Sequence, residues 1–282
     1  MRRLVPLGVV ALAALAGADS PAAAQTLRDF SVERGRRSET SLRAIVDFAA
    51  GELFIRPSTS NALYRLQLAY DADRYEPVGQ YDATRGTVHL GVDKRPERKG
   101  VPRDQLPQRA VVELSPDVDL TIEANLGAAE SSLELGGLRI EDLAVSTGAS
   151  RTEVRFSRAN PGRCRQAQVT TGAAEFRVKQ LGNSGCRRWT IEGGVGQVRL
   201  DLDGAWPEGA EVRVRMTVGA VVLEAPRDLG IRIELDRFLA AFERAGFRRD
   251  GNTYVSDNYR SARRTVDLTI ETTLGNVKVE WR

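Results

Sequence analysis

The chain has 282 residues, with 41 Lys and Arg against 38 Asp and Glu, one His and two Cys. Because opposite charges are nearly balanced and interspersed, the composition argues against a nucleic-acid-binding protein. One histidine and two cysteines supply too few ligands for a zinc site, and no sequence pattern indicates another metal or a cofactor.

Residues 1–24 have the pattern of a secretory signal peptide. Two arginines precede an apolar run over residues 4–16, and small residues lead to a cleavage site after Ala24. The run is shorter than the roughly 20 residues of a spanning helix, which disfavours the alternative of an uncleaved anchor. Ala18 stands where a lipoprotein signal would carry its cysteine. We therefore expect a secreted or periplasmic protein that begins at Gln25 and has no transmembrane segment after cleavage.

A short pattern recurs along the rest of the chain: an apolar run, a glycine, and then alternating apolar and polar residues. From Gly127 onward the glycines are 21, 24, 22 and 25 residues apart, which is typical of one turn of a β-solenoid. Apolar residues follow each glycine at even offsets, so they share one face of a strand. The pattern predicts an all-β protein, a parallel β-helix or solenoid bent at each glycine, with a β-sandwich as the alternative. The repeat glycines are Gly51, Gly127, Gly148, Gly172, Gly194, Gly219 and Gly275.

Charged residues occupy the odd offsets after the glycines. Strands that stack in parallel lie about 4.8 Å apart, so equivalent positions of successive coils become neighbours. We expect these charges to pair across coils and to form a solvated sheet face rather than an active site. The expected pairs are Glu134 with Arg155, Glu153 with Arg177, and Lys179 with Asp201.

Residues 93–108 are charged and rich in proline, which is typical of an exposed loop. This loop divides the mature chain into an N-terminal β unit, residues 25–108, and a solenoid, residues 109–282. Within the solenoid, apolar residues at helical spacing and a stop at Gly246 predict a short capping helix over residues 235–246. The apolar residues of this helix are Leu235, Phe238, Leu239 and Phe242.

The chain continues past the predicted helix into a hairpin or loop, with Asp250 and Gly251 as its turn. It then ends on a further strand.

The two cysteines, Cys164 and Cys186, are 22 residues apart, which is one period of the repeat. Each lies eight residues before a repeat glycine, so they occupy the same position in consecutive coils. The distance of about 4.8 Å between stacked strands is within the range that a disulfide spans. A secreted protein also meets an oxidising compartment. We predict a disulfide between them rather than a metal site or a redox pair.

Nucleophilic catalysis has no good candidate. His89 lies at an alternating position of a strand and has no nucleophile motif beside it, so we interpret it as an ordinary strand residue. The tryptophans fit packing positions better than binding platforms. They are Trp189, Trp206 and Trp281.

Carboxylate pairs are the remaining catalytic option. In two places, two aspartates lie two residues apart and so share a strand face. Glycoside hydrolysis needs two carboxyl groups that face each other across a groove, which this spacing does not establish. The pairs are Asp117 with Asp119 and Asp201 with Asp203; the second is the candidate ligand-binding pair of an alternative function.

Three segments share the glycine and strand pattern of a known family: residues 49–90 (beginning AAGELFIRPSTS), residues 133–156 (LELGGLRIEDLAVSTGASRTEVRF) and residues 273–282 (TLGNVKVEWR). They resemble the toast-rack and LiaF-like group of bacterial envelope domains. The resemblance implies a right-handed parallel β-solenoid and a non-enzymatic role at the cell envelope, in proteins often associated with responses to cell-wall stress. It implies no catalytic residues.

Taken together, these patterns predict a non-enzymatic scaffold or interaction module of the cell envelope. Its expected partner is an envelope protein or a cell-wall component. One alternative is a polysaccharide-binding or polysaccharide-cleaving β-helix that uses Asp201 and Asp203. Another is self-association through the ends of the solenoid.

Overall fold

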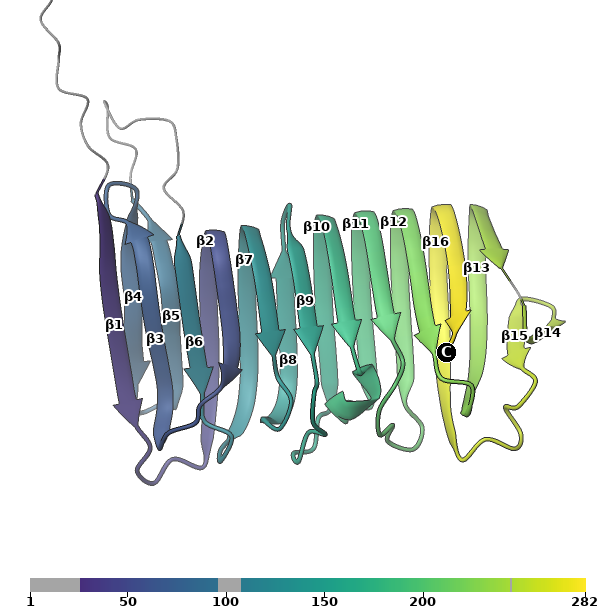
Figure 1. The fold of residues 1–282 in the computed structure, drawn as a ribbon, viewed down its shortest axis with the longest axis horizontal. Coiled ribbons are helices and arrows are strands. Elements are labelled where there is room, and N and C mark those ends of the chain that lie inside the picture. Colours follow the sequence, from purple (N-terminus) through teal and green to yellow (C-terminus); the bar gives the residue numbers. More distant parts are fainter. Residues whose placement is uncertain (1–25, 96–107, 244) are drawn as a thin grey trace, which may run out of the picture.

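A computed structural model describes residues 26–95, 108–243 and 245–282. The predicted signal peptide and most of the predicted loop over residues 93–108 lie outside these ranges. The described chain is nearly all strand, and the strands stack side by side into one elongated body (Figure 1). No helix in these ranges is long and apolar enough to cross a membrane.

The structure contains sixteen strands and one short 3-10 turn, η1 (Leu181–Ser184). The strands are β1 (Leu27–Gly35), β2 (Ser41–Pro57), β3 (Ala62–Asp71), β4 (Tyr75–Asp82), β5 (Thr87–Lys94), β6 (Arg109–Leu114), β7 (Asp119–Glu134), β8 (Arg139–Thr147), β9 (Arg151–Arg155), β10 (Gln166–Lys179), β11 (Arg188–Asp201), β12 (Glu211–Ala225), β13 (Leu229–Glu243), β14 (Phe247–Asp250), β15 (Thr253–Ser256) and β16 (Arg264–Trp281).

Each long strand bends near its middle and contributes one half to each of two sheets. In β7, residues 119–126 pair with β2 and β8, whereas residues 130–134 pair with β2 and β9. We call the half before the bend the first arm and the half after it the second arm. Neighbouring coils pair in parallel, and alternate side chains of both arms are buried between the two sheets. The predicted all-β parallel solenoid is therefore confirmed.

The glycines mark the bends, as predicted, but not all of them lie opposite one another. Gly51 is opposite Ala129 rather than Gly127. Gly219 is opposite Gly196 on one side and Gly275 on the other, rather than opposite Gly194. The sequence Gly-Gly-Val-Gly at the bend of β11 contains two glycines that fit the pattern. Spacing alone does not distinguish Gly194 from Gly196, because a bend at either glycine leaves a second arm of similar length.

The order of strands departs from the order of the chain at both ends. From β7 to β12 each coil lies beside the one before it, but β16 is inserted between β12 and β13. At the other end, β2 lies between β7 on one side and β5 and β6 on the other. Each of the two longest strands, β2 and β16, therefore has neighbouring strands on both of its edges. The predicted division between residues 108 and 109 stays a prediction.

The predicted capping helix over residues 235–246 is wrong, because residues up to Glu243 belong to β13. Leu235 is buried opposite Ile270 in the first arm, and Phe242 lies opposite Val277 in the second arm. The strand bends between them. Buried or half-buried side chains alternate with exposed ones on each side of the bend, but the alternation changes phase at the bend itself. This shift produces apolar spacings that resemble a helix, while hydrogen bonds to β16 hold residues 229–243 in an extended strand.

An aromatic hairpin follows β13, at the position where the sequence predicted a hairpin or loop. β14 pairs antiparallel with β15, and Asp250 lies opposite Thr253 across the predicted turn. The ring of Tyr254 lies 4.6 Å from that of Phe242, and the ring of Phe247 lies 5.3 Å from that of Trp281, centroid to centroid. Such contacts add to the burial of apolar surface. The hairpin therefore packs against the C-terminal end of the solenoid core.

The structure contains the predicted disulfide between Cys164 and Cys186, with their Cα atoms 4.3 Å apart. Both residues are almost fully buried. Two residues later in each coil, Gln166 lies opposite Arg188, which is the same separation of 22 residues. The bond therefore joins equivalent positions of successive coils.

Candidate interaction surface

The structure places Asp201 at the end of β11 and Asp203 in the turn that follows. The carboxylate of Asp201 accepts a hydrogen bond from the backbone N–H of Asp203 at 3.1 Å and lies 3.6 Å from the guanidinium of Arg282. A carboxylate oxygen of Asp203 accepts from the N–H of Gly204 at 2.7 Å. Both carboxylates hold the local backbone, so a polysaccharide role for this pair stays a prediction that the geometry does not support.

The other candidates for chemistry are also held in structural contacts. Asp117 pairs with Arg36 at 3.4 Å and Asp119 pairs with Arg139 at 2.9 Å, so these two aspartates point to different partners. His89 is an exposed residue of β5. Among the residues that the structure describes, no three His, Cys, Asp or Glu side chains are grouped as a metal site requires.

The three tryptophans are used in packing. Trp189 donates its indole N–H to the Ser184 hydroxyl at 3.0 Å. Trp206 donates to the Leu202 carbonyl at 2.7 Å, and Trp281 donates to the Ala245 carbonyl at 3.0 Å. Trp189 is completely buried. These contacts agree with the packing interpretation rather than with open binding platforms.

The predicted rows of charge are present, but the ion pairs join different residues. Glu153 lies opposite Arg177, as expected, yet its carboxylate binds Lys179 at 2.9 Å and Arg155 at 3.1 Å. Asp201 binds Arg282 rather than Lys179. Long basic side chains reach diagonal as well as direct neighbours on a sheet, so register alone does not determine the partner.

The ion pair between Lys179 and Glu153 should make stability depend on pH. Burial raises the pKa of Glu153, but the hydrogen bonds and charges of Lys179 and Arg155 outweigh it and hold the pKa below its ordinary value of 4.5. Because the pKa is lower in the folded state, this stabilisation is complete above the unfolded-state pKa and is lost as pH falls through the folded-state pKa.

Replacing Lys179 by methionine should therefore lower the free energy of unfolding by less than about 1 kcal/mol at neutral pH. The difference from the wild type should disappear in acid, where Glu153 is protonated. Urea denaturation of both proteins at neutral and acidic pH measures this. A difference that grew as the pH fell would contradict the assignment.

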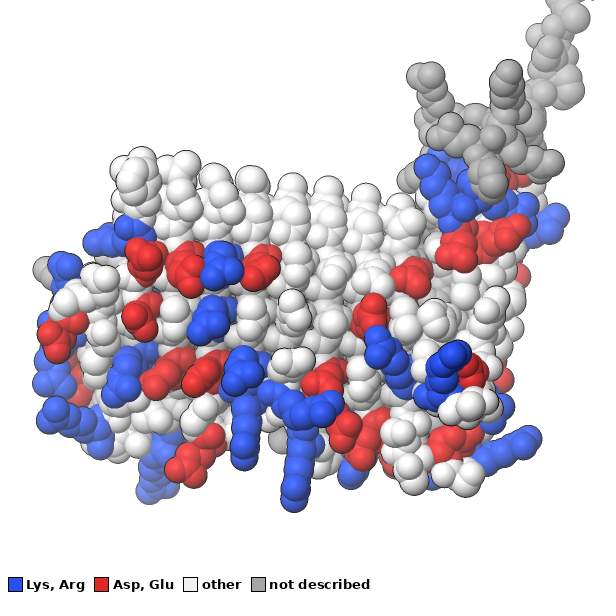
Figure 2. All heavy atoms as spheres, turned by 180° about the vertical axis from the view of Figure 1, so that it is seen from behind, with Lys and Arg blue, Asp and Glu red and all other residues white. Residues whose placement is uncertain are grey.

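The outer edge of the bends forms an apolar ridge along the solenoid. Consecutive strands place small or apolar residues opposite one another there, in a single column that crosses the stack. We call this column the bend ridge; its members in the described pairings are Ala50, Ala128, Ala173, Val195, Val218, Leu274 and Leu239. Figure 2 shows the edge as a band without charged side chains, above a row of charged ones.

The ridge is most apolar toward the C-terminal end of the stack. Val195, Leu274 and Leu239 are 55%, 39% and 64% exposed, and Phe238 beside them is 78% exposed. Of the five large hydrophobic side chains exposed in the described residues, four belong to this region, and only Leu27 lies elsewhere. Contiguous exposed apolar surface of this kind typically marks an interaction site.

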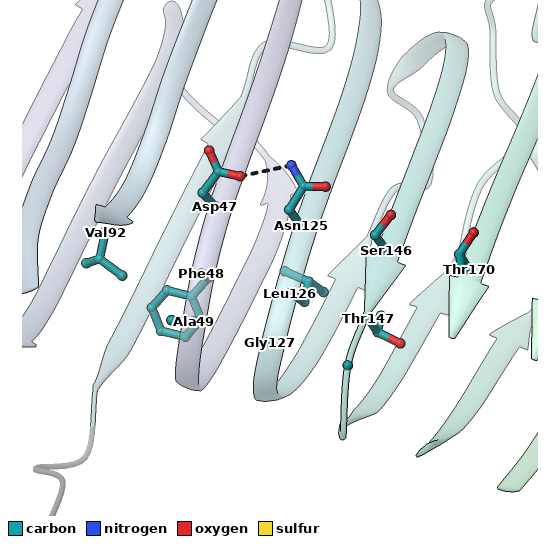
Figure 3. A pocket seen from close by; sticks show the side chains of 11 residues that line it. Asp47, Phe48, Ala49, Val92, Asn125, Leu126, Gly127, Ser146, Thr147 and Thr170 are labelled. Atoms are coloured by element: carbon teal, nitrogen blue, oxygen red, sulfur yellow. Dashed lines mark hydrogen bonds between the residues drawn. The ribbon is translucent and has the colours of Figure 1, made fainter. Parts of the chain in front are cut away.

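A polar row runs along the first arms, just before the bends. At the N-terminal end of the stack it consists of Asp47, Asn125, Ser146 and Thr170, which lie opposite one another on successive strands. Here the surface has a shallow hollow of about 440 Å3, and the Asn125 side chain donates to Asp47 at 2.9 Å (Figure 3). Toward the C-terminal end the row becomes charged, with Arg215 bound to Glu192 at 3.2 Å and to Glu271 at 2.8 Å.

The ridge and the polar row together can bind a partner by apolar contact and hydrogen bonding. The charged side chains of the polar row bind neighbours in the same row, with Asn125 on Asp47 and Arg215 on Glu192 and Glu271.

The sequence pattern did not reveal the ridge, because its members do not keep one position relative to the repeat glycine. Ala128, Ala173 and Val195 come directly after a repeat glycine, whereas Val218 and Leu274 come directly before one. The signal in the sequence that could have revealed the ridge was an apolar residue adjacent to the glycine in successive copies of the repeat.

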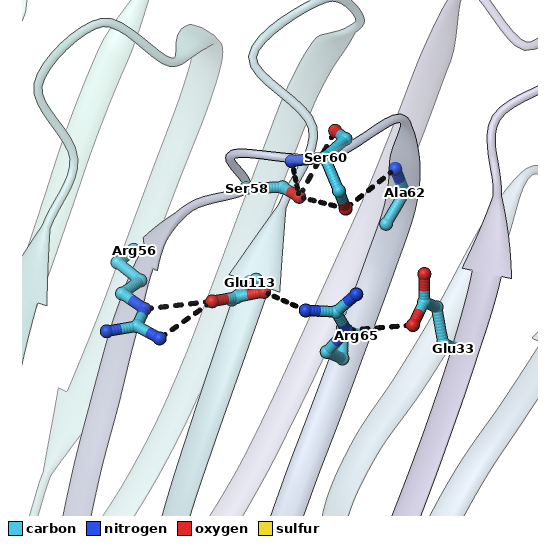
Figure 4. A network of polar contacts seen from close by, with 7 residues as sticks. All are labelled: Glu33, Arg56, Ser58, Ser60, Ala62, Arg65 and Glu113. Carbon is cyan, nitrogen blue, oxygen red and sulfur yellow. Dashed lines mark hydrogen bonds and ion pairs between the residues drawn. The ribbon is translucent and has the colours of Figure 1, made fainter.

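A row of four charges crosses β1, β3, β6 and β2 on the second-arm sheet (Figure 4). The Glu113 carboxylate accepts hydrogen bonds from Arg56 at 2.8 Å and from Arg65 at 3.0 Å. Arg65 also donates to Glu33 at 2.8 Å, and this hydrogen bond lowers the pKa of Glu33 below its ordinary value. The Glu113 side chain is only 8% exposed. We assign this row to stability, because its members bind one another.

Replacing Glu113 by glutamine should lower the free energy of unfolding by about 2 kcal/mol, because two guanidinium groups lose a buried charged acceptor. The matched control is Glu130→Gln, since Glu130 is 68% exposed and lies 3.7 Å from Arg151. Its cost should stay below about 0.5 kcal/mol. Urea denaturation midpoints compare the two, and equal losses would show that burial of Glu113 does not matter.

The family model for the N-terminal domain of toast_rack, DUF2154, matches residues 22–179. The chain belongs to the toast-rack family. The matched residues of this toast-rack protein include the N-terminal strands, the hollow at Asp47 and the coils up to β10. The LiaF-like part of the resemblance stays a prediction.

Two solved structures align with most of the toast-rack chain. A candidate cell adhesion protein from Clostridium sporogenes is 15% identical, with 91% of this chain and 100% of that one covered and a TM-score of 0.45. A candidate adhesin from Bacteroides fragilis is 10% identical, with 89% and 97% covered and a TM-score of 0.44. With both TM-scores below 0.5, these alignments assign no function to the chain. No curated protein matches its sequence at a significant level.

Proposed function

We propose that this protein is a non-enzymatic interaction module of the bacterial cell envelope, secreted through its predicted signal peptide. The observation that carries the proposal is the bend ridge, an uncharged apolar edge exposed beside a polar row. Membership of the toast-rack family supports it, as does the disulfide, because disulfides persist in oxidising compartments outside the cytosol. The proposed partner is an envelope protein that packs apolar side chains along the ridge.

Site-specific photocrosslinking in the producing bacterium tests this proposal. A photoreactive residue at Val195 lies on the ridge, and one at Ser132 is a matched control on the outer face of the second arms, where Ser132 is also exposed. The proposal expects one reproducible protein adduct from Val195 and none from Ser132, with the adduct lost in a Val218→Lys variant. Equal labelling from both positions would contradict it.

A role in cell-wall stress, as the family resemblance implies, extends this proposal. Deletion of the gene should change sensitivity to cell-wall-active antibiotics, and the Ser132→Lys form should restore the wild-type response while the Val195→Lys form should not. Conversely, turnover of a cell-wall glycan by the purified protein, abolished by Asp201→Asn, would contradict a non-enzymatic function.

A further inference from the structure

Two turns meet toward the C-terminal end of the stack, on the edge opposite the bends (Figure 1). One joins β12 to β13 over residues 226–228, and the other joins β15 to β16 over residues 257–263. They come together because β16 is inserted between β12 and β13. Here the surface has a hollow of about 710 Å3, which we call the turn hollow. Its polar lining residues are Arg227, Asp228, Asn258, Ser261, Arg263 and Arg264.

Hydrogen bonds hold the walls of the turn hollow in place. The Asn258 side chain donates to the backbone carbonyls of Arg227 at 2.9 Å and Leu229 at 3.1 Å, which joins one turn to the other. The Ser256 hydroxyl donates to the Asn258 side chain at 2.7 Å, and the Ser261 hydroxyl donates to the Asn258 backbone carbonyl at 3.1 Å. The amide group of Asn258 and the hydroxyl of Ser261 are therefore occupied within the wall. The guanidinium groups are the donors left to face a ligand.

The turn hollow carries an excess of positive charge. Three arginines and one aspartate line it, so two positive charges are uncompensated. Arg264 is bound by Asp228 at 2.8 Å and also donates to the Gly204 carbonyl. Arg227 and Arg263 are exposed, and neither forms an ion pair within the described ranges of the chain. Two guanidinium groups are thus available to an anion.

The arginines in the charged rows of the sheets are compensated differently. Arg215 is bound to two carboxylates, those of Glu192 and Glu271. Arg56 and Arg65 share the carboxylate of Glu113. The turn hollow, by comparison, has one carboxylate for three arginines. Its charge is therefore not explained by pairing within the protein.

The donors and the charge of the turn hollow fit a phosphate group. A guanidinium can donate two parallel hydrogen bonds to the oxygens of one phosphate. A phosphate monoester carries a charge of about −1.5 to −2 near neutral pH, which matches the two uncompensated positive charges. A carboxylate carries one negative charge and would leave half of them uncompensated. The volume also leaves room for the molecule that bears the phosphate.

We propose that the turn hollow binds a phosphate monoester, with Arg227 and Arg263 donating to its oxygens beside the charge of Arg264. The phosphate belongs either to a soluble phosphate ester or to a lipid headgroup, and its chemistry is the same in both. The site lies on the edge opposite the bend ridge. The proposal therefore goes beyond the proposed function and requires no partner on the ridge.

Isothermal titration calorimetry of the purified secreted chain with glycerol phosphate, at constant ionic strength, tests the site. Arg227→Gln and Arg263→Gln should each raise the dissociation constant by roughly tenfold, because each removes a charged donor. Asp228→Asn should lower it by roughly threefold, because it removes the carboxylate that competes for Arg264. The matched control is Arg163→Gln, at an exposed turn arginine outside the hollow, which should leave the constant unchanged. Circular dichroism establishes that each variant is folded.

Cosedimentation with vesicles distinguishes the two sources of phosphate. Binding to vesicles of phosphatidylcholine and phosphatidic acid, but not of phosphatidylcholine alone, with release by glycerol phosphate, assigns the site to a lipid headgroup. Binding of glycerol phosphate without vesicle binding assigns it to a soluble ester. The proposal is overturned if neither binds or if acetate binds as tightly as glycerol phosphate. Equal weakening by Arg163→Gln and Arg227→Gln would also overturn it, since that result indicates attraction to the whole basic edge.

Discussion

Replacing Gly219 by alanine should lower the free energy of unfolding by about 3 kcal/mol or more. Gly219 has a φ of 139°, a backbone conformation that residues with a Cβ rarely adopt. A Cβ at this position would also collide with the carbonyl oxygen of Gly196 in the neighbouring coil. Because both strands are hydrogen-bonded on either side of the bend, neither can move away without breaking its pairing. Urea denaturation measures the loss.

Gly209→Ala is the matched control for this prediction. Gly209 also has a positive φ, 69°, but no atom lies within 4 Å of the position that a Cβ would take. Its cost should stay near the roughly 1–2 kcal/mol of left-handed strain alone. If the two variants were equally destabilised, close stacking of the bends would not be the reason for the repeat glycines.

Removing the disulfide should have an effect of similar size. The bond between Cys164 and Cys186 closes a loop of 22 residues, and its loss should lower the free energy of unfolding by about 3 kcal/mol by releasing the unfolded chain. The double variant Cys164→Ala and Cys186→Ala should show this loss in urea denaturation. The wild type should move toward the variant when it is unfolded with a reducing agent.

The double variant itself provides the control, because a reducing agent should not change its unfolding midpoint. Mass spectrometry of protein purified from the envelope should find both thiols oxidised. Free thiols in that preparation, or a variant as stable as the wild type, would contradict a stabilising disulfide and remove one support for secretion.

The central coils could be predicted from sequence because their contacts repeat a local pattern. Alternation of apolar residues sets which side of each strand is buried, and a bend glycine in every coil fixes the length of a turn. The cysteines followed from the same period, since positions one period apart become neighbours in the stack. Local spacing was misleading at two bends. In β13 a shift of phase imitated a helix, and in β11 the spacing selected Gly194, although Gly196 is the residue opposite Gly219.

The partners in the ion pairs were less predictable, because they depend on how far each long side chain reaches. Lys179 and Glu153 occupy the predicted rows, but their ion pair joins diagonal rather than direct neighbours. A flexible lysine has several acceptors within reach on a sheet face, and their free energies differ by less than sequence patterns can resolve. Asp201 likewise binds Arg282, which is distant in sequence and comes near only after the last strand is in place.

The sequence by itself determined the period, the buried face and the pairing of cysteines, because these depend on residues within one or two coils of each other. Only the tertiary structure decided the order of strands at the two ends, where β16 enters between β12 and β13. That insertion makes β13 the neighbour of β16 and brings Leu239 beside Leu274 on the bend ridge. The interaction surface depends on contacts between segments far apart in the chain, which no local repeat can encode.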